Sequence, residues 1–223
     1  MTSDCNYSFI RISKTEGLEE SAAKYRELRL RGLQASPSSF SSTYEIESAF
    51  AEADWIERLS APGRENFICV AKASSTAQSD QGEWIGQVTL RGPLSKSEFS
   101  LAKESGQLLG ESDEEERWQL LSLYILPEHR GAGLGGTLCR KTLNYLQSYQ
   151  SSPEKVHVRL MIKPDNHAAV KLYEHLGFTH SGKCTLAEAL LANGDGHLLP
   201  SDASSPKYST RTGLIMSIYI QRP

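Results

Sequence analysis

The stretch Gln119-Leu-Leu-Ser-Leu-Tyr-Ile-Leu-Pro-Glu-His-Arg-Gly-Ala-Gly-Leu-Gly-Gly136 decides the fold of this chain. It opens with an apolar run of strand-forming residues, and Pro127 ends that run because proline cannot donate to a sheet. Glycine and alanine fill residues 131–136 except for Leu134, and leucines recur at helical spacing beyond them. The first N–H groups of a helix have no partner, and the helix dipole favours negative charge there. With Arg130 beside it, the stretch predicts a phosphate or pyrophosphate site.

Three kinds of glycine loop could explain this pattern. A Walker loop needs Gly-Lys-Ser/Thr, and here Thr137 follows Gly136 with no lysine before it. The dinucleotide fingerprint G-x-G-x-x-G is present, but residues 127–130 separate it from its strand, and the next predicted strand ends too late, near Ile162. A tight strand-to-helix turn that binds no ligand is the remaining simple interpretation.

Two motifs together give a third kind of loop. Arg130-Gly-Ala-Gly133-Leu-Gly135 reads R-x-x-G-x-G. Asn166-His-Ala-Ala-Val-Lys-Leu-Tyr173-Glu-His-Leu-Gly177-Phe178 reads N-x-x-A-x-x-L-Y-x-x-x-G-F, with every fixed position filled. In this order and spacing the two motifs make the chain resemble the GNAT N-acetyltransferases, most clearly from about Asn66 to Gly182.

The expected order of elements, β-α-α-β-β-β-α-β-α-β-β, is also that of the GNAT family. The resemblance therefore implies an α+β (α/β three-layer) GNAT fold, with a mixed, mostly antiparallel sheet of about seven strands and helices on both faces. In the family the two central strands splay apart, and the pantetheine arm of acetyl-CoA lies between them. Here those strands correspond to residues 120–126 and 156–162.

The resemblance also implies which residues bind acetyl-CoA. Carried over position by position, they are Leu123, Tyr124 and Ile125 on the strand, Arg130, Gly131, Ala132, Gly133, Leu134, Gly135 and Gly136 in the loop, and Asn166 and Tyr173 beyond it. The Tyr173 hydroxyl is implied to lie near the sulfur and to protonate or stabilise the leaving thiolate. The alternative is a tyrosine that packs in the core with its hydroxyl merely satisfied.

The acceptor side is less well defined. Residues 35–47 resemble the A-x-P-x-x-F-x-S-x-x-E linker of small GNAT enzymes, so Phe40, Tyr44 and Glu45 are implied to bind the acceptor. A Pro/Ser loop with Phe40 plugging the core is the alternative. The strand 120–126 has no carboxylate, so the general base is open. Glu45 is the favoured candidate, against Glu47, Glu116, a water chain, or a Glu45 that only complements the helix dipole.

The function implied is an acetyl-CoA-dependent N-acetyltransferase that acts on a primary amine of a small molecule or peptide by direct attack in a ternary complex. A lysine-like amine has a pKa of about 10.4, so a base or a desolvating pocket must release its proton. One alternative is a catalytically silent acyl-CoA-binding module of the same fold. A nicotinamide-dependent oxidoreductase, suggested by the literal G-x-G-x-x-G pattern, is a third.

Length and composition fit a soluble globular protein with a single domain over residues 1–223, which the resemblance identifies as the N-acetyltransferase domain. A net charge of −3 argues against nucleic acid as a partner, and no apolar run is long enough to suggest a membrane span. The four cysteines lie far apart, which suggests reduced thiols and no metal site. We therefore expect a cytoplasmic monomer or homodimer, with a nuclear location left open, and we expect Cys69 and Cys139 to be buried.

Several local expectations follow from patterning. Residues 18–33 form an amphipathic helix that buries Ala22, Tyr25, Leu28 and Leu33, with Arg26, Arg29 and Arg31 on its solvated side. Residues 41–60 form a second helix, His157 is half exposed, Asp165 or Asn166 caps a helix, and Gly177 ends it. The segments 92–116 and 186–212 are flexible insertions. The first is solvated, or alternatively forms an acidic rim that attracts a cationic acceptor.

Overall fold

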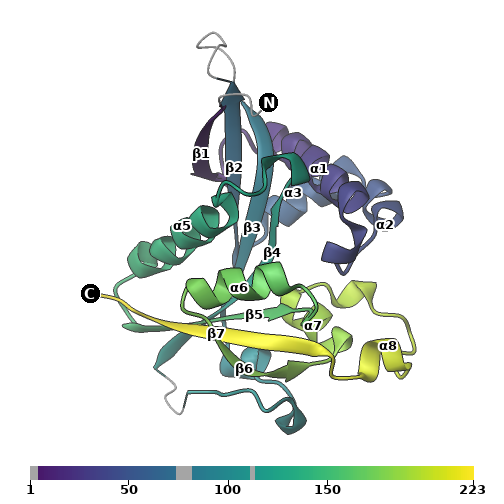
Figure 1. Cartoon of the computed structure of the whole chain (residues 1–223), viewed down its shortest axis with the longest axis vertical. Coiled ribbons are helices and arrows are strands. Elements are labelled where there is room, and N and C mark those ends of the chain that lie inside the picture. Colours follow the sequence, from purple (N-terminus) through teal and green to yellow (C-terminus); the bar gives the residue numbers. More distant parts are fainter. Residues whose placement is uncertain (1–4, 74–81, 111–113) are drawn as a thin grey trace. The chain divides into compact units, whose positions relative to one another are not determined.

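The computed structural model of the chain describes residues 5–73, 82–110 and 114–223 (Figure 1). The strands are β1 (Cys5–Arg11), β2 (Arg64–Ala73), β3 (Glu83–Leu94), β4 (Glu115–Ile125), β5 (Lys155–Ile162), β6 (Thr179–Cys184) and β7 (Gly213–Gln221). The α-helices are α1 (Leu18–Ala35), α2 (Tyr44–Ser48), α3 (Glu52–Ser60), α4 (Lys96–Phe99), α5 (Leu134–Tyr149), α6 (His167–His175), α7 (Leu186–Asn193) and α8 (Pro206–Ser209). Short 3-10 turns are η1 (Pro37–Ser39), η2 (Lys103–Ser105), η3 (Pro127–His129) and η4 (Gly196–Leu198).

The strands form one seven-stranded sheet in the order β1-β2-β3-β4-β5-β7-β6. The pairs β1/β2, β5/β7 and β6/β7 are antiparallel, whereas β4/β5 is parallel. The predicted α+β fold with a mixed sheet of seven strands is therefore confirmed. The parallel pairing runs from Glu115–Lys155 to Gln119–Arg159, and β4 continues to Ile125. Ladder pairing with β5 thus involves the first part of β4.

The chain divides into two compact units. Unit 1 contains Met1–Thr89 and Ser122–Thr142, and unit 2 contains Leu90–Leu121 and Leu143–Pro223. The predicted glycine loop and acceptor linker belong to unit 1, whereas the helix that carries Tyr173 belongs to unit 2. No helix in the described parts of the chain has the length and apolar character needed to cross a membrane.

In unit 1, α1 packs against α2 and α3 with the face that the sequence predicted. The apolar residues of that face are all at least 97% buried: Ala22, Tyr25, Leu28 and Leu33. The prediction for Arg29 was wrong, because its side chain is only 8% exposed. Arg29 points inward since the carboxylate of Glu47 lies inside the unit and binds it.

The predicted helix over residues 41–60 is two helices, α2 and α3. Thr43 starts α2 by accepting a hydrogen bond from the N–H of Ile46 at 3.4 Å. A second start follows because the Asp54 carboxylate accepts the N–H of Ala51 at 2.7 Å. This side-chain contact gives α3 its own N-terminus, so the chain interrupts the helix between the two caps.

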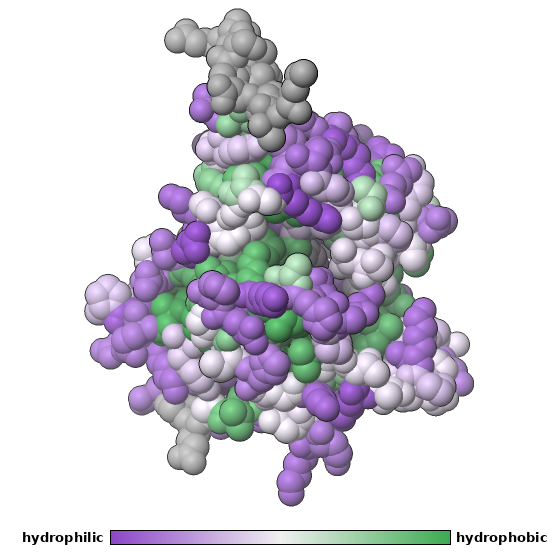
Figure 2. All heavy atoms as spheres, viewed as in Figure 1, coloured by the Kyte–Doolittle hydropathy of each residue, from purple (hydrophilic) through white to green (hydrophobic). Residues whose placement is uncertain are grey.

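In unit 2, β5 leads into α6, drawn in green in Figure 1. The Asn166 side chain accepts the N–H of Ala169 at 3.2 Å, and Gly177 follows the helix with φ 91°. Both predicted helix-end residues are therefore confirmed. Hydrophilic side chains cover α6 on the face seen in Figure 2, in agreement with the exposure of Lys171 and Glu174.

The segment 92–116 has much more structure than the sequence suggested. It contains the end of β3, then α4 and η2, and finally the start of β4. Phe99 from this segment is fully buried, and Leu108 donates its N–H to the carbonyl of Ser181 at 3.0 Å. Burial of Phe99 attaches the segment to the sheet, so its described residues are not a fully solvated loop. The segment 186–212, predicted as an insertion, contains α7, η4 and α8.

Candidate functional site

The glycine loop of unit 1 connects β4 to α5. Leu126, just after the strand, donates its N–H to the Ile85 carbonyl at 2.8 Å. Gly131 and Gly133 have φ values of 88° and 71°, which non-glycine residues adopt only with strain. Apart from the neighbouring residues in the chain, no atom of the described residues lies within 4 Å of the position that a Cβ would take at either glycine. The glycines therefore line open space instead of filling a packing gap.

The first turn of α5 faces this open space with its N–H groups. Thr137 donates its N–H to the Gly133 carbonyl at 3.1 Å, the first such bond of the helix. The N–H groups of residues 134–136 come before that bond, so they have no carbonyl acceptor within the helix. Leu134 is 7% exposed and anchors the helix start. Free N–H donors, a positive helix end and open backbone together fit a phosphate group.

Arg130 is an exposed residue, and its guanidinium is held by contacts within unit 1. Its Nε donates to the Ile125 carbonyl at 2.9 Å, and Nη2 donates to Ser36 Oγ at 3.2 Å. Its plane lies over the ring of Tyr124, 5.1 Å from the centroid. Even its backbone N–H is used, bonding to the Pro127 carbonyl at 3.2 Å. Arg130 thus ties the end of β4 to the residue that follows α1.

The short turn η3, which precedes the glycine loop, is also held by side-chain contacts. Arg31 of α1 binds Glu128 at 2.9 Å and also pairs with Glu83 of β3. The Tyr7 hydroxyl lies 3.3 Å from Nδ1 of His129. Two elements, α1 and β1, therefore hold η3 directly, and Glu83 of β3 holds Arg31 in place, so the loop starts from a fixed position.

The predicted acceptor linker lies against this strand end. Phe40 packs on Tyr124 with ring centroids 4.9 Å apart, and the Tyr124 hydroxyl donates to Ser36 Oγ at 3.1 Å. A Cβ on Gly32 would lie 2.9 Å from Cε1 of Tyr124 and 3.2 Å from Cζ of Phe40. Phe40 and Tyr124 are therefore brought together, with α1 in close contact. Tyr44 begins α2 and is half buried.

The candidate general bases differ greatly in environment. Glu45 is exposed in the first turn of α2, and hydrogen bonds with its own backbone and with Thr43 lower its pKa. The carboxylate of Glu47 is fully buried between Arg29 and Arg58. Burial would raise the pKa of Glu47, but the hydrogen bond and charge of Arg29 and the charge of Arg58 outweigh it and lower the pKa.

Glu116 is likewise engaged, in unit 2. Its carboxylate accepts from Nη2 of Arg222 and from Nε1 of Trp118, both at 2.6 Å, and pairs with Gln150. Arg222 also reaches the Leu146 carbonyl at 2.9 Å. Two of the three carboxylates considered as bases, Glu47 and Glu116, are therefore held in structural ion pairs.

Tyr173 and Asn166 are placed by α6 in unit 2. Tyr173 is 6% exposed and makes an edge-to-face contact with Phe178, with centroids 5.5 Å apart. Asn166 uses its Oδ1 as the helix cap, so its amide NH2 is the part left to bind a ligand. The Tyr173 ring thus has a fixed packing partner within its own unit.

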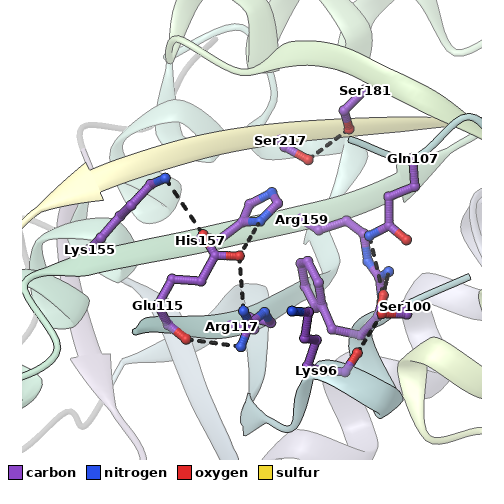
Figure 3. A network of polar contacts seen from close by, with 11 residues as sticks. Lys96, Ser100, Gln107, Glu115, Arg117, Lys155, His157, Arg159, Ser181 and Ser217 are labelled. Atoms are coloured by element: carbon purple, nitrogen blue, oxygen red, sulfur yellow. Dashed lines mark hydrogen bonds and ion pairs between the residues drawn. The ribbon is translucent and has the colours of Figure 1, made fainter. Parts of the chain in front are cut away.

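The sequence did not predict a charge cluster in unit 2, the Glu115 cluster (Glu115, Arg117, Lys155 and His157), whose side chains are buried except for that of Lys155, which is 43% exposed (Figure 3). The Glu115 carboxylate lies 3.2 Å from Arg117, 3.7 Å from Lys155 and 3.6 Å from Nδ1 of His157. His157 is fully buried, not half exposed as predicted, and it stacks on Tyr219. Alternation along β4 and β5 could have placed these side chains on one face, but not their burial.

Burial controls the protonation of the cluster. It lowers the pKa of His157 to about 4, although the charge of Glu115 acts in the opposite direction. Next to it, burial lowers the pKa of Arg159 to about 10; this guanidinium donates to Gln119 at 2.7 Å and to the Phe99 carbonyl. Because Arg159 holds α4 through Phe99, we assign this part of unit 2 a structural role.

Cysteine and metal chemistry have little support. Cys69, Cys139 and Cys184 are buried, which confirms the expected burial of the first two. Burial raises the pKa of Cys69 to about 11 and that of Cys139 to about 12, so neither thiol is a ready nucleophile. Within residues 5–73, 82–110 and 114–223, no three acidic, histidine or cysteine side chains are grouped closely enough to hold a metal ion.

Comparisons with known proteins address the sequence and the fold separately. The sequence profile described as the Acetyltransferase (GNAT) family matches residues 32–178. A mycothiol acetyltransferase of Acidothermus cellulolyticus is 41% identical over 78 residues, which are 33% of this chain. The matched stretch spans only 23% of that relative's length.

Solved structures resemble nearly the whole chain. The acetyltransferase of GNAT family from Streptococcus pneumoniae superposes with a TM-score of 0.57 at 13% identity, covering 96% of this chain and 99% of that one. Arabidopsis thaliana NAA60 in complex with acetyl-CoA gives a TM-score of 0.55 at 15% identity, with 96% and 99% covered. At such low identities the likeness establishes the fold alone.

Proposed function

The profile match covers more than half of the chain, so this protein belongs to the GNAT acetyltransferase family, and we propose that it transfers the acetyl group of acetyl-CoA to a primary amine of a small molecule or peptide. The observation that carries this proposal is the open loop of unit 1. Gly131 and Gly133 leave room for phosphate oxygens, and the free N–H groups at the start of α5 supply donors.

We assign the binding of acetyl-CoA as follows. The main-chain N–H groups of residues 131–136 hold the diphosphate. Backbone groups of Leu123, Tyr124 and Ile125 hold the pantetheine arm, and the amide of Asn166 adds a hydrogen bond. Acetyl-CoA supplies an activated thioester carbonyl. The strand and loop assignments rest on unit 1, and those of Asn166 and Tyr173 rest on the second sequence motif.

The residues then divide the chemistry of acyl transfer. A neutral amine attacks the thioester carbonyl directly, and its proton passes to a base. The N–H of Ile125 is assigned to the developing oxyanion. The Tyr173 hydroxyl donates its proton to the departing thiolate, or stabilises it by a hydrogen bond. Phe40 and Tyr44 shape the acceptor side, next to Tyr124.

The base remains a proposal with one carboxylate favoured. Glu47 and Glu116 are held by arginines, whereas the Glu45 carboxylate faces solvent in the first turn of α2. The lowered pKa of Glu45 makes it a weak base. We assign proton removal to Glu45 because it is the accessible carboxylate of the three, and a chain of water molecules is the alternative to it.

The second candidate is an acyl-CoA-binding module without catalysis. It is favoured by the engagement of Glu47 and Glu116 and by the absence of a carboxylate at residues 120–126. Release of free thiol from acetyl-CoA, measured with a panel of polyamines, amino acids and peptides, separates the two. We expect turnover with at least one amine; binding of acetyl-CoA without turnover across the panel would support the module.

A further inference from the structure

Two arginines lie next to the glycine loop, and they differ in how they are used. Arg130 stands before the loop and is bound by Ile125, Ser36 and the ring face of Tyr124. Arg140 stands on α5, one turn after Gly136. Its side chain takes part in no hydrogen bond or ion pair within the described residues, and it is exposed.

Arg140 reaches back over the start of its own helix. A Cβ on Gly136 would lie 3.8 Å from its Nη1 and 3.9 Å from its Nη2. Helical side chains lean toward the N-terminus, so this direction is the natural one. The guanidinium therefore lies beside the free N–H groups of the first turn, at the positive end of the helix dipole.

This placement is unfavourable in the absence of an anion. A cation near a helix N-terminus is repelled by the dipole, typically by a few tenths of a kcal/mol to about 1 kcal/mol. An anion bound at the loop reverses the sign, because the N–H groups and the guanidinium then attract the same charge. Gly136 makes the approach possible, since it places no side chain between Arg140 and the first turn.

Arg130 is placed for a different task. Its Nη2 shares the Ser36 hydroxyl oxygen with the hydroxyl of Tyr124, at 3.2 and 3.1 Å. Ser36 is the residue that caps the C-terminus of α1 and opens the acceptor linker. Phe40 from the same linker packs on Tyr124 at 4.9 Å. Arg130 therefore joins the linker to the carbonyl at the end of β4.

We propose that Arg140 provides the ionic contact to the phosphate groups of coenzyme A, and that Arg130 is a positioning residue that fixes the acceptor linker against the end of β4. This division of roles rests on the proposed function. It assigns the positive charge that contacts the phosphates to Arg140, which the sequence motif does not include. The motif had given this role to Arg130. The main-chain N–H groups keep their role in both cases.

The test measures the binding of coenzyme A itself by calorimetry at low and high salt, with no acceptor present. We expect Arg140→Gln to weaken binding about tenfold at low salt and to reduce the salt dependence. Lys141→Gln is the matched control, because it removes the same charge from the next exposed position of α5. That control should stay within about threefold of the wild type, and Arg130→Gln should lose less affinity and less salt dependence than Arg140→Gln.

Backbone hydrogen exchange gives the second readout. We expect faster exchange across residues 36–47 in Arg130→Gln and also in the milder Ser36→Ala, but not in Arg140→Gln. Circular dichroism checks that each variant is folded. If Arg130→Gln does not fold, Ser36→Ala tests the positioning role in its place. Unchanged exchange in the folded variants would overturn the positioning role.

The outcomes distinguish a failure of the assigned arginine roles from a failure of the proposed function. If the wild type binds coenzyme A and Arg140→Gln binds it equally well, the role of Arg140 is wrong while the function stands. A large affinity loss with a flatter salt response in Arg130→Gln would return the phosphate contact to Arg130. If the wild type fails to bind coenzyme A at all, the proposed function falls, and this division of roles with it.

Discussion

Arg29 and Glu47 form a two-pronged ion pair inside unit 1, with nitrogen–oxygen distances of 2.6 and 2.9 Å. Arg58 approaches the second carboxylate oxygen at 2.9 Å, and the Arg29 guanidinium lies 4.4 Å from the centroid of Phe40. One fully buried carboxylate therefore links α1, α2 and α3, and it does so beside the linker assigned to the acceptor.

Glu47→Gln should lower the free energy of unfolding by about 3 kcal/mol, because it leaves two arginines facing a neutral amide in a buried site. Urea unfolding followed by circular dichroism measures the change. Glu45→Gln is the control: the same substitution two residues earlier removes an exposed charge, and the unfolding curve should hardly move. An unchanged unfolding curve for Glu47→Gln would mean that the ion pair of Arg29 and Glu47 contributes nothing to stability.

The free energy of unfolding should decrease as the pH drops below about 6.5, because His157 takes up a proton more readily in the unfolded chain than in the folded protein. Its pKa is about 4 in the folded protein and about 6.5 when unfolded, so between those values only the unfolded chain takes up this proton. The contribution is lost as the pH falls through this window and levels off below about 4. Between pH 7 and 5 the loss is on the order of 2 kcal/mol.

Urea unfolding of the wild type and of His157→Gln at both pH values tests this. The variant should lose less stability on acidification than the wild type, because glutamine does not titrate. Glu115, Arg117, Lys155 and Arg159 surround the ring and stay in both proteins, so the difference isolates His157. Parallel curves for the two proteins would contradict the prediction.

Gly133→Val should abolish measurable binding of coenzyme A. A valine at φ 71° is strained, and its side chain would occupy the open space assigned to phosphate. Gly17→Val is the matched control within unit 1, since Gly17 has φ 58° and similarly open surroundings. It should bear a similar strain yet bind normally. Normal affinity in a folded Gly133→Val protein would refute the loop assignment.

Tyr173→Phe should reduce the turnover number by about 100-fold or more while the dissociation constant of acetyl-CoA changes little. Phenylalanine keeps the ring contact with Phe178, so the melting temperature should stay near that of the wild type. Thiol release at saturating acetyl-CoA, combined with calorimetry, gives both quantities. An unchanged rate would remove the acid role from Tyr173 and leave it as a packing residue.

Local patterns in the sequence predicted local structure well. The buried face of α1, the Asn166 cap and the strand–loop–helix around Gly133 each depend on residues a few positions apart. The buried charges were beyond such patterns. Arg29 is buried because Glu47 meets it from another helix, and His157 because Phe99 and Tyr219 cover it. Their partners are distant in sequence, so hydrophilicity alone placed them wrongly at the surface.

The candidate site divides in the same way. The motif predicted the loop and its glycines, whose conformations are set by their own backbone. The motif could not predict that the Arg130 side chain turns toward Ser36, 94 residues earlier in the chain. The spacing of the motif therefore predicts the backbone conformation of the loop more reliably than the contacts of the Arg130 side chain.

The contact of α1 with two aromatic rings has an evolutionary consequence. At Gly32 even a methyl group would collide with Tyr124 and crowd Phe40. A mutation to alanine there would require the rings at positions 124 and 40 to shift or be replaced by smaller side chains. Among homologues we therefore expect positions 32, 40 and 124 to covary, so that the glycine is inherited together with the aromatic pair it accommodates.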